Sequence, residues 1–398
     1  MDITIYPGRL QGTVRAIPSK SQAHRLLICA AFADRETELF CPQTNQDIEA
    51  TAACLCALGA AIRRTADGYV ITPIVKPSGT ATLHCGESGS TLRFMLPIAG
   101  ALGVDALFQM EGRLSQRPLS PLWEEMERMG CTLTRPTYNT IHCTGQLQCG
   151  NYTIDGSVSS QFITGLLFAM ALIPGCSHLT VTGKTESKPY IEMTRQALSL
   201  FGVDVENEYT PSSLPLHTPG RIAVEGDWSN GAFFLAAQKM GNPLCVEGLN
   251  PCSPQGDRAA VEILNGLDSH SIISAADIPD LVPILAVAAV GKHGAVFTDI
   301  QRLRLKESDR VLSVINMLAA LGVHAEATED TLTVHPGKFK GGIVDAVNDH
   351  RIAMSAAIAA TTAEGPVTIL DAHCVAKSYP AFWDEYRRLG GNYEQYIR

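Results

Sequence analysis

The sequence predicts an α/β protein built from six copies of one βαβαββ unit, and three observations support this. First, a polar cluster followed by a helical run of small and apolar residues and then a glycine occurs six times. Second, strand-like segments such as "SHLTVTGK" and "GPVTILDAH" follow these runs. Third, another polar cluster and an amphipathic helix with a Leu-Gly or Met-Gly stop complete most units. The apolar runs start near Ser21, Ser88, Ser159, Trp228, Pro279 and Asp349.

The spacing of these runs indicates compact units rather than a solenoid. Most runs start about 70 residues apart, whereas solenoid repeats take about 20 to 50 residues. Several units close with paired strands, such as "VHAEATEDTLTVHP", in which "TEDT" is a turn signal. The fourth unit is shorter, because "SHSIISAAD" alone separates "EILNGLD" from "IPDLVP". We therefore expect the fourth unit to lack its closing strand pair.

Composition excludes several classes of protein. The 398 residues suffice for two or three domains, and 45% hydrophobic with 18% charged residues indicates a globular chain rather than a disordered one. The net charge of −9 argues against nucleic acid as the main partner. The apolar runs are too short to span a membrane, and the first ten residues do not resemble a signal peptide.

The twelve cysteines do not predict a metal site. They are scattered, without a CxxC pair, and no two histidines have the sequence spacing typical of metal ligands. Neighbours such as His142 and Cys143 lie in strand-like segments, where adjacent side chains point to opposite faces. We expect mostly buried, reduced thiols in a cytoplasmic protein.

Cations gather at the starts of the predicted helices. A helix N-terminus carries partial positive charge, so basic side chains are unfavourable there unless an anion binds. Ordinary N-caps are the alternative, but caps need Ser or Asp and do not explain basic or amide residues just inside the helix. This pattern predicts a small substrate with several phosphates or carboxylates. The residues concerned are Lys20, Arg93, Gln161 and Arg351 in the first clusters, and Arg117, Lys188, Lys306, Arg310 and Lys377 in the second.

Nine motifs, in order along the whole chain, resemble the 5-enolpyruvylshikimate-3-phosphate (EPSP) synthase family. No single motif is specific, but nine in the family's order are. They are Pro18-Ser19-Lys20-Ser21 with Arg25, "GESGSTLR" ending at Arg93, Arg117-Pro118, "SSQF" from Ser159, "SKPY" from Ser187, "IPD" ending at Asp280, "KESDR" from Lys306, "DHR" from Asp349 and "AKSYP" with Lys377.

The resemblance implies a two-domain enolpyruvyl-transferase fold, an inside-out α/β barrel with three repeats per domain and a truncated fourth repeat. The N-terminal domain would comprise residues 18–225, and the C-terminal domain residues 1–17 plus 226–398. The substrates would bind between the domains, whose closure would exclude water.

The implied reaction transfers the enolpyruvyl group of phosphoenolpyruvate to the 5-hydroxyl of shikimate 3-phosphate and releases phosphate, on the route to chorismate and aromatic amino acids. It needs an acid, a base and donors for the phosphates and carboxylates. It implies no cofactor and no metal. The expected partners are these two substrates, with no nucleic acid and no membrane, for a cytoplasmic monomer that glyphosate inhibits.

The resemblance also implies the residues of the site. Catalysis would use Lys20, Asp280 as the base at the 5-hydroxyl and Glu307 as the acid at the methylene. Shikimate 3-phosphate would contact Lys20, Ser21, Arg25, Ser159, Ser160, Gln161, Ser187, Tyr190, Asp280 and Lys306. Phosphoenolpyruvate would contact Lys20, Gly89, Arg117, Gln161, Arg310, Arg351 and Lys377.

Two departures and several alternatives accompany these expectations. Glu87 adds an anion near the expected carboxylate site, and Arg302 replaces an asparagine that contacts a substrate phosphate in the family. Asp280 has an alternative interpretation as a helix N-cap, and Glu307 as a surface ion-pair partner of Arg310.

The related transferase that uses UDP-N-acetylglucosamine is one alternative for the whole chain, although its lysine-asparagine pair and loop cysteine are missing here. A non-catalytic anion-binding relative is the other.

Overall fold

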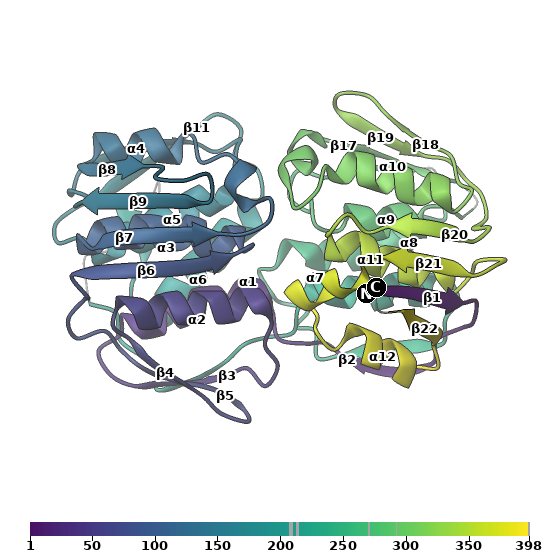
Figure 1. Cartoon of the computed structure of the whole chain (residues 1–398), viewed down its shortest axis with the longest axis horizontal. Coiled ribbons are helices and arrows are strands. Elements are labelled where there is room, and N and C mark those ends of the chain that lie inside the picture. The colour runs from purple at the N-terminus through teal and green to yellow at the C-terminus, as the bar shows by residue number, and fades with distance from the viewer. Residues whose placement is uncertain (207–209, 212–214, 270, 292, 397–398) are drawn as a thin grey trace. The chain divides into compact units, whose positions relative to one another are not determined.

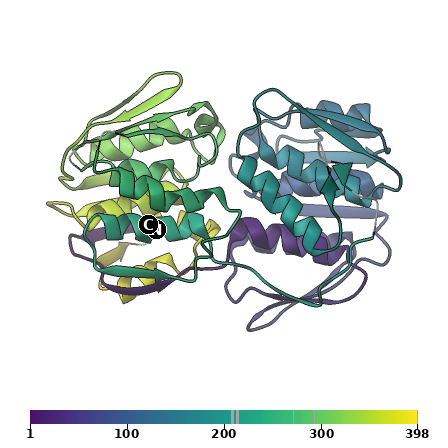
Figure 2. The same cartoon turned by 180° about the vertical axis from the view of Figure 1, so that it is seen from behind.

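The computed structural model describes residues 1–206, 210–211, 215–269, 271–291 and 293–396 (Figure 1). The chain divides into two compact units, each with its own hydrophobic core. The N-terminal unit is Pro18–Glu225, and the C-terminal unit combines Met1–Ile17 with Gly226–Arg398. Figure 2 shows the same elements from behind.

The N-terminal unit contains three βα repeats. Two of them form four-stranded sheets, with strand orders β14-β3-β5-β4 and β6-β7-β9-β8, and the third pairs β10 with β11 in parallel. Its helices are α1 (Lys20–Ala31), α2 (Gln46–Leu58), α3 (Gly89–Leu102), α4 (Leu122–Arg128), α5 (Ser160–Leu172) and α6 (Lys188–Leu200). Its strands are β3 (Thr37–Phe40), β4 (Ala61–Arg64), β5 (Gly68–Thr72), β6 (Thr80–Gly86), β7 (Asp105–Met110), β8 (Cys131–Thr134), β9 (Thr140–Gly145), β10 (Asn151–Asp155), β11 (His178–Thr182), β12 (Val205–Glu206), β13 (Thr210–Pro211) and β14 (Arg221–Ala223).

The C-terminal unit repeats this plan with sheets β15-β2, β16-β17-β19-β18 and β20-β21-β1-β22. Its helices are α7 (Trp228–Lys239), α8 (Ala260–Gly266), α9 (Val282–Ala288), α10 (Arg310–Ala320), α11 (His350–Ala360) and α12 (Phe382–Arg388). Its strands are β1 (Asp2–Tyr6), β2 (Gly12–Arg15), β15 (Leu244–Glu247), β16 (Ser271–Ser274), β17 (Ala295–Thr298), β18 (Ala325–Ala327), β19 (Thr331–Val334), β20 (Gly342–Asp345), β21 (Val367–Leu370) and β22 (Asn392–Tyr396).

The structure confirms the predicted repeats. In the second repeat the order β6-α3-β7-α4-β8-β9 is the complete βαβαββ unit, with β6 parallel to β7 and the closing hairpin antiparallel. The fourth repeat is short as expected, because β2 and β15 are the two described strands of its sheet. The described strands form separate sheets with linear strand orders, rather than one closed barrel.

In four repeats the second polar cluster overlaps a short 3-10 helix ahead of the outer helix. These 3-10 helices lead into α4, α8, α10 and α12. They are η1 (Leu114–Gln116), η2 (Gly256–Ala259), η3 (Gln301–Leu305) and η4 (Ala372–Lys377).

The inner helices of both units are buried almost all round, as their apolar sequences require. In α1 the residues that are not buried form the first turn, Lys20 to Gln22, and in α11 every residue is buried. Helix α5 packs closely against α3 because Gly165 lies on the backbone oxygen of Arg93, where any Cβ would collide. In α3 the oxygen of Arg93 would normally accept a hydrogen bond from residue 97, but Pro97 has no N–H. Gly165 therefore packs against an oxygen that lacks its helical hydrogen bond.

None of the described helices is both long enough and apolar enough for a membrane span.

Candidate active site

Three inner helices of the N-terminal unit begin at predicted site residues. Lys20, Gly89 and Ser160 are the first residues of α1, α3 and α5. A serine caps each helix, and its hydroxyl accepts a hydrogen bond from a backbone N–H of the first turn. The three helix starts therefore present N–H dipoles and hydroxyls, which suit an anion. The caps are Ser19, Ser88 and Ser159.

Lys20 is paired with a carboxylate that sequence reasoning missed. Its Nζ lies 2.9 Å from Oδ2 of Asp47 in the first turn of α2, and both side chains are 16% exposed. Asp47 therefore offsets the charge of Lys20 next to the positive end of α1. The sequence showed only that α2 has an acidic first turn. It did not show the pairing, because Lys20 and Asp47 are 27 positions apart.

Arg25 links α1 to α6 from a buried position. Its guanidinium donates to Oγ1 of Thr194 at 2.9 Å and to the backbone oxygens of Ser21 at 2.6 Å and Tyr190 at 2.8 Å. Burial lowers the pKa of Arg25 to about 10, although nearby Tyr190 opposes the shift. These contacts fix the positions of Ser21 and Tyr190, two residues predicted to bind the same substrate.

Gly89 leaves space for two guanidinium groups. A Cβ at this position would stand 2.7 Å from Nη1 of both Arg117 and Arg93. Arg93 is buried and donates to Oε1 of Gln161 at 2.9 Å, while Nε2 of Gln161 donates to Oγ of Ser90 at 2.9 Å. The side-chain amide of Gln161 is thus held between the starts of α3 and α5. Arg93 was predicted as part of the cation pattern, but its contact with Gln161 was not.

Other predicted residues of this unit also lie at helix starts, in the caps or first turns of α1, α5 and α6. Ser187 is buried at the start of α6 and adopts a left-handed backbone with φ of 54°, which is strained for a residue with a Cβ. Ser160 is buried, whereas Ser21, Ser159 and Tyr190 are partly exposed. Glu87 points its carboxylate against Gly112 in the loop after β7, where a Cβ would collide with it.

In the C-terminal unit a buried arginine organises the predicted residues. Arg310 is 1% exposed and contacts three carboxylates: Asp280 at 2.5 Å, Glu307 at 2.6 Å and Asp349 at 2.9 Å. Burial disfavours the charge of Arg310, but the three anions outweigh it and raise the pKa well above the usual value. The predicted Glu307–Arg310 pair therefore exists, but it is anchored in a buried network and is not an ordinary surface pair.

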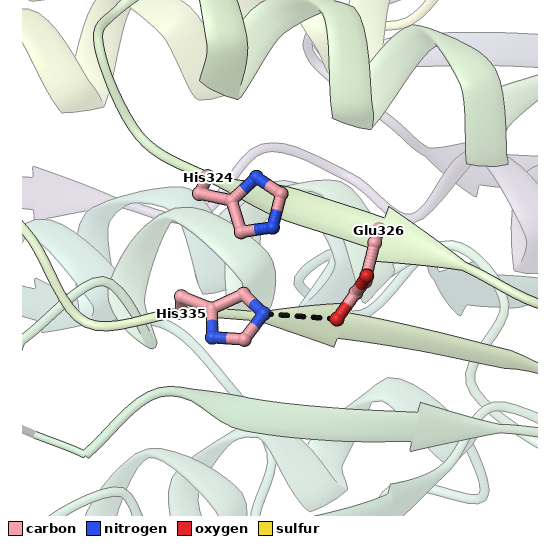
Figure 3. Close-up of side chains that lie close together, drawn as sticks. All are labelled: His324, Glu326 and His335. Atoms are coloured by element: carbon pink, nitrogen blue, oxygen red, sulfur yellow. Dashed lines mark hydrogen bonds and ion pairs between the residues drawn. The ribbon is translucent and has the colours of Figure 1, made fainter.

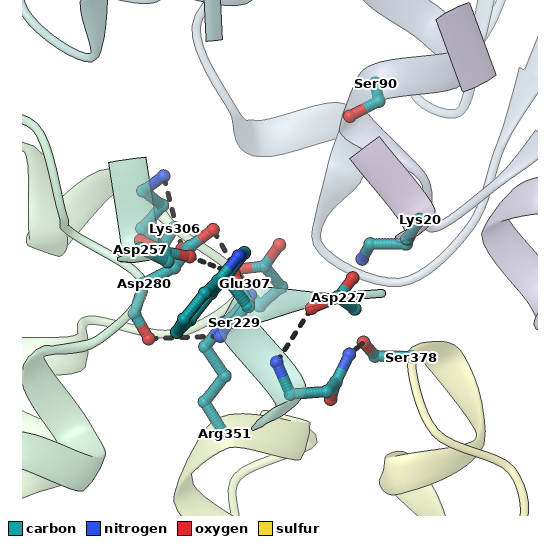
Figure 4. Close-up of polar contacts among 12 residues, drawn as sticks. Lys20, Ser90, Asp227, Ser229, Asp257, Asp280, Lys306, Glu307, Arg351 and Ser378 are labelled. Atoms are coloured by element: carbon teal, nitrogen blue, oxygen red, sulfur yellow. Dashed lines mark hydrogen bonds and ion pairs between the residues drawn. The ribbon is translucent and has the colours of Figure 1, made fainter. Parts of the chain in front are cut away.

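Asp280 collects three cations. Besides Arg310, Oδ2 lies 3.2 Å from Nη2 of Arg351, and Oδ1 lies 3.6 Å from Nζ of Lys306 (Figure 4). Burial alone would raise the pKa of Asp280, but these cations hold it well below its usual range. The N-cap position of α9 belongs to Leu281, so the alternative interpretation of Asp280 as the cap is wrong. Asp280 is an ionised acceptor at neutral pH.

Lys306 is unusually easy to deprotonate. Its side chain is 20% exposed, and burial lowers the pKa to about 8 against the favourable charge of Asp280. The positive charges of Arg310 and then Arg302 contribute to this lowered pKa, so the departure from the family pattern at Arg302 acts close to Lys306. Lys377, also buried, donates from Nζ to the backbone oxygen of Asn348 at 2.9 Å.

Sequence reasoning missed one more carboxylate of this cluster. Asp257 is buried, and the hydroxyl of Ser229 donates to it (Figure 4). Burial first, and the charge of Asp280 second, raise the pKa of Asp257 to about 7 while Arg351 opposes them. The sequence does contain a sign of this residue. Asp257 lies in the second polar cluster "PCSPQGDRA", whereas the second clusters of other repeats carry basic residues.

Each unit thus carries a group of polar side chains with a distinct chemistry. The N-terminal group combines helix dipoles, hydroxyls and guanidinium groups that can bind phosphate or carboxylate. The C-terminal group interleaves Asp280 and Glu307 with Lys306, Arg310 and Arg351, so carboxylates that can move protons stand beside cations that can bind an anionic substrate.

Comparisons with known proteins agree with this chemistry. The family model described as EPSP synthase (3-phosphoshikimate 1-carboxyvinyltransferase) matches residues 5–272 and 269–386. A 3-phosphoshikimate 1-carboxyvinyltransferase from Clostridium botulinum is 36% identical over 98% of both chains, and one from Clostridium kluyveri is 35% identical over 99% of this chain and 98% of the relative. The structure of an EPSP synthase from Acinetobacter baumannii has a TM-score of 0.80 at 25% identity, covering 99% of this chain and 100% of the other.

The two segments that match the family model overlap at residues 269–272, after α8 and at the start of β16. The Clostridium botulinum alignment runs over 428 positions, more than the 398 residues of this chain.

We predict that Asp349→Ala lowers the free energy of unfolding by about 3 kcal/mol, because it removes a buried partner of Arg310 as well as the N-cap of α11. Asp309→Ala is the matched control: it removes the N-cap of α10, a partly exposed aspartate, and should cost about 1 kcal/mol. Urea unfolding followed by tryptophan fluorescence measures both. Equal losses would contradict the buried ion pair.

The pH dependence gives a second check of this pair. Burial raises the pKa of Asp349, but the charge of Arg310 outweighs it and lowers the value below that of a free aspartate. The stabilisation from Asp349 is therefore complete above about pH 4 and is lost as the pH falls through the lowered value. The difference between wild type and Asp349→Ala should shrink over that range.

Proposed function

The chain belongs to the EPSP synthase family, and on this premise we propose that it transfers the enolpyruvyl group of phosphoenolpyruvate to the 5-hydroxyl of shikimate 3-phosphate. Phosphate is the second product. The observation that carries the proposal is the cluster around Arg310, in which Asp280 and Glu307 share one buried guanidinium with Asp349. The enzyme would serve the shikimate pathway as a 3-phosphoshikimate 1-carboxyvinyltransferase.

Shikimate 3-phosphate would bind mainly to hydroxyls and one lysine. The starts of α5 and α6 supply serines beside helix N–H groups, which suit a phosphate dianion. Asp280 would accept the hydrogen bond of the 5-hydroxyl that reacts. The proposed ligands are Lys20, Ser21, Arg25, Ser159, Ser160, Gln161, Ser187, Tyr190, Asp280 and Lys306.

Phosphoenolpyruvate would bind mainly to guanidinium groups. Arginine offers paired N–H donors that match planar carboxylate and phosphate faces. Because Gly89 has no side chain, the substrate could approach Arg117 closely. The proposed ligands are Lys20, Gly89, Arg117, Gln161, Arg310, Arg351 and Lys377, so the proposal requires both units to reach the same pair of substrates.

The ion pairs suggest how substrate binding would prepare the base. Arg310 and Arg351 hold the carboxylate of Asp280 in its ionised, weakly basic form. A bound phosphate or carboxylate would share these guanidinium groups and weaken their hold on Asp280. The pKa of Asp280 would then rise toward the range useful for proton transfer. Asp280 would take the proton of the 5-hydroxyl as its oxygen bonds to the carbon that carries the phosphate, and Glu307 would protonate the methylene of phosphoenolpyruvate. The tetrahedral adduct would then lose phosphate and a proton of the new methyl group, which regenerates the double bond.

Two alternatives make different predictions. The transferase that uses UDP-N-acetylglucosamine is disfavoured because Ser21 follows Lys20 where that family has asparagine, and "EGRLSQRP" contains no cysteine. A binding protein without catalysis is disfavoured because Lys20, Asp280 and Glu307 are all present. We further propose that the enzyme works as a monomer in the cytoplasm, for which its twelve free thiols are suited.

We expect phosphate release from phosphoenolpyruvate with shikimate 3-phosphate and none with UDP-N-acetylglucosamine. Glu307→Gln should reduce kcat by roughly 100-fold or more, since general acid catalysis contributes about 10² to 10⁴. Glu385→Gln is the matched control, because Glu385 contacts Arg388 at i,i+3 and 2.6 Å, as Glu307 contacts Arg310. Release with neither acceptor would overturn the proposed function. Equal behaviour of the two variants would overturn the role of Glu307.

We expect kcat/KM for shikimate 3-phosphate to fall as the pH rises above about 8. Loss of the proton from Lys306 removes a cation that attracts the phosphate, and kcat/KM reports the pKa of the free enzyme. In Lys306→Arg this fall should disappear, because a guanidinium stays charged. Lys340→Arg, at an exposed lysine paired with Glu364, serves as the control and should keep the fall. A fall that persists in Lys306→Arg would assign it to another group.

We expect Gly89→Ala to raise KM for phosphoenolpyruvate by roughly tenfold or more and KM for shikimate 3-phosphate much less. The new Cβ would displace the guanidinium of Arg117, and a charge-assisted hydrogen bond is worth about 1.5–3 kcal/mol. Gly79→Ala is the control, because a Cβ there meets no atom within 4 Å. Steady-state kinetics with each substrate varied separate the two constants. An unchanged KM for phosphoenolpyruvate would exclude the proposed place of Gly89.

A further inference from the structure

A surface hairpin of the fifth repeat carries three potential metal ligands on one face. Strands β18 and β19 are antiparallel, with Ala325 opposite Val334, so His324 and His335 form the next cross-strand pair. The backbone N–H of His335 donates to the oxygen of His324 at 3.0 Å, which fixes this register. Glu326 stands two residues after His324 and therefore shares its face.

The three side chains already converge. The two imidazole rings stack with centroids 4.7 Å apart and planes 24° apart, and Nε2 of His335 lies 3.2 Å from Oε1 of Glu326 (Figure 3). One ligand atom from each residue lies within 4.8 Å of the other two. Within the part of the chain that the structure describes, no other three His, Cys, Asp or Glu side chains converge in this way.

We propose that His324, Glu326 and His335 bind a divalent transition-metal ion, with Zn²⁺ as the representative. Two imidazole nitrogens and one carboxylate oxygen form a donor set typical of zinc and unlike the all-oxygen sites of magnesium and calcium. Ligand atoms around tetrahedral zinc stand about 3.3 Å apart, which follows from bonds of about 2.0 to 2.1 Å. Small side-chain rotations reach this spacing, and water would fill the fourth position.

The hairpin holds the ligands in place before any ion arrives. On its opposite face Ala325, Leu332 and Val334 are buried in the core, so the strands cannot slip without exposing them. At the turn, the hydroxyl of Thr328 accepts hydrogen bonds from the backbone N–H groups of Asp330 and Thr331. Binding therefore costs mainly the rotamer freedom of three side chains. The site does not depend on the proposed enzymatic function.

The test is a calorimetric titration of the full-length protein with Zn²⁺. Exposed cysteines also bind zinc, so the thiols are first alkylated with iodoacetamide. We expect one ion per chain, and at least a roughly tenfold weaker affinity in His324→Ala and in His335→Ala. His142→Ala is the matched control: His142 lies 2.6 Å from Asp105 in a surface pair with a single histidine, and its loss should leave affinity unchanged.

Two results would overturn the proposal. One is wild-type affinity and stoichiometry in the double variant His324→Ala/His335→Ala. The other is the absence of binding to alkylated wild type up to about 1 mM Zn²⁺. A second readout uses the wild type alone: Zn²⁺ should slow amide exchange in β18, the edge strand it ties to β19, whereas Mg²⁺ should not.

Discussion

The structure depends on one constraint: its inner helices are buried on nearly every side, so side chains that must reach solvent or a substrate can stand only at the helix ends. In α1 that limit leaves the first turn, and in α5 it leaves Gln161 and the terminal Leu172. Burial also forces the helix starts to satisfy their N–H groups, which serine and aspartate caps do. Core packing and anion-binding chemistry are therefore consequences of the same sequence pattern, not separate features.

The two polar groups solve the problem of holding many cations in different ways. In the N-terminal unit, guanidinium groups donate to backbone and amide oxygens, as Arg25 and Arg93 do. In the C-terminal unit, Arg310 is surrounded by carboxylates, and each ion pair needs the others because a buried charge without partners is costly. Backbone and amide oxygens do not titrate, so these contacts of the first arrangement do not couple to the pKa of an acceptor. The second couples every change of charge at one residue to the pKa of its neighbours.

The sequence predicted the repeats well because the pattern that marks them is local. Helix starts, glycine stops and the missing strands of the fourth repeat are all visible within a few residues. Contacts between distant residues were not visible: Asp47 with Lys20, and Asp349 with Arg310, depend on how repeats pack. The histidine pair was missed for another reason. His324 and His335 are eleven positions apart, and only the hairpin register makes them neighbours. The functional roles of the site residues remain predictions.

The position of β1 has a consequence for the order in which the two units can fold during synthesis. This first strand lies between β21 and β22, pairing Ile3 with Ile369 on one side and with Gln395 on the other. The N-terminal unit contains all its own strands within residues 18–225, so it can fold while the ribosome is still translating the rest. Strand β1 must therefore wait for β21 and β22, which are synthesised long after it. Until residues 392–396 are made, β1 lacks one of the two strands with which it pairs in the finished sheet.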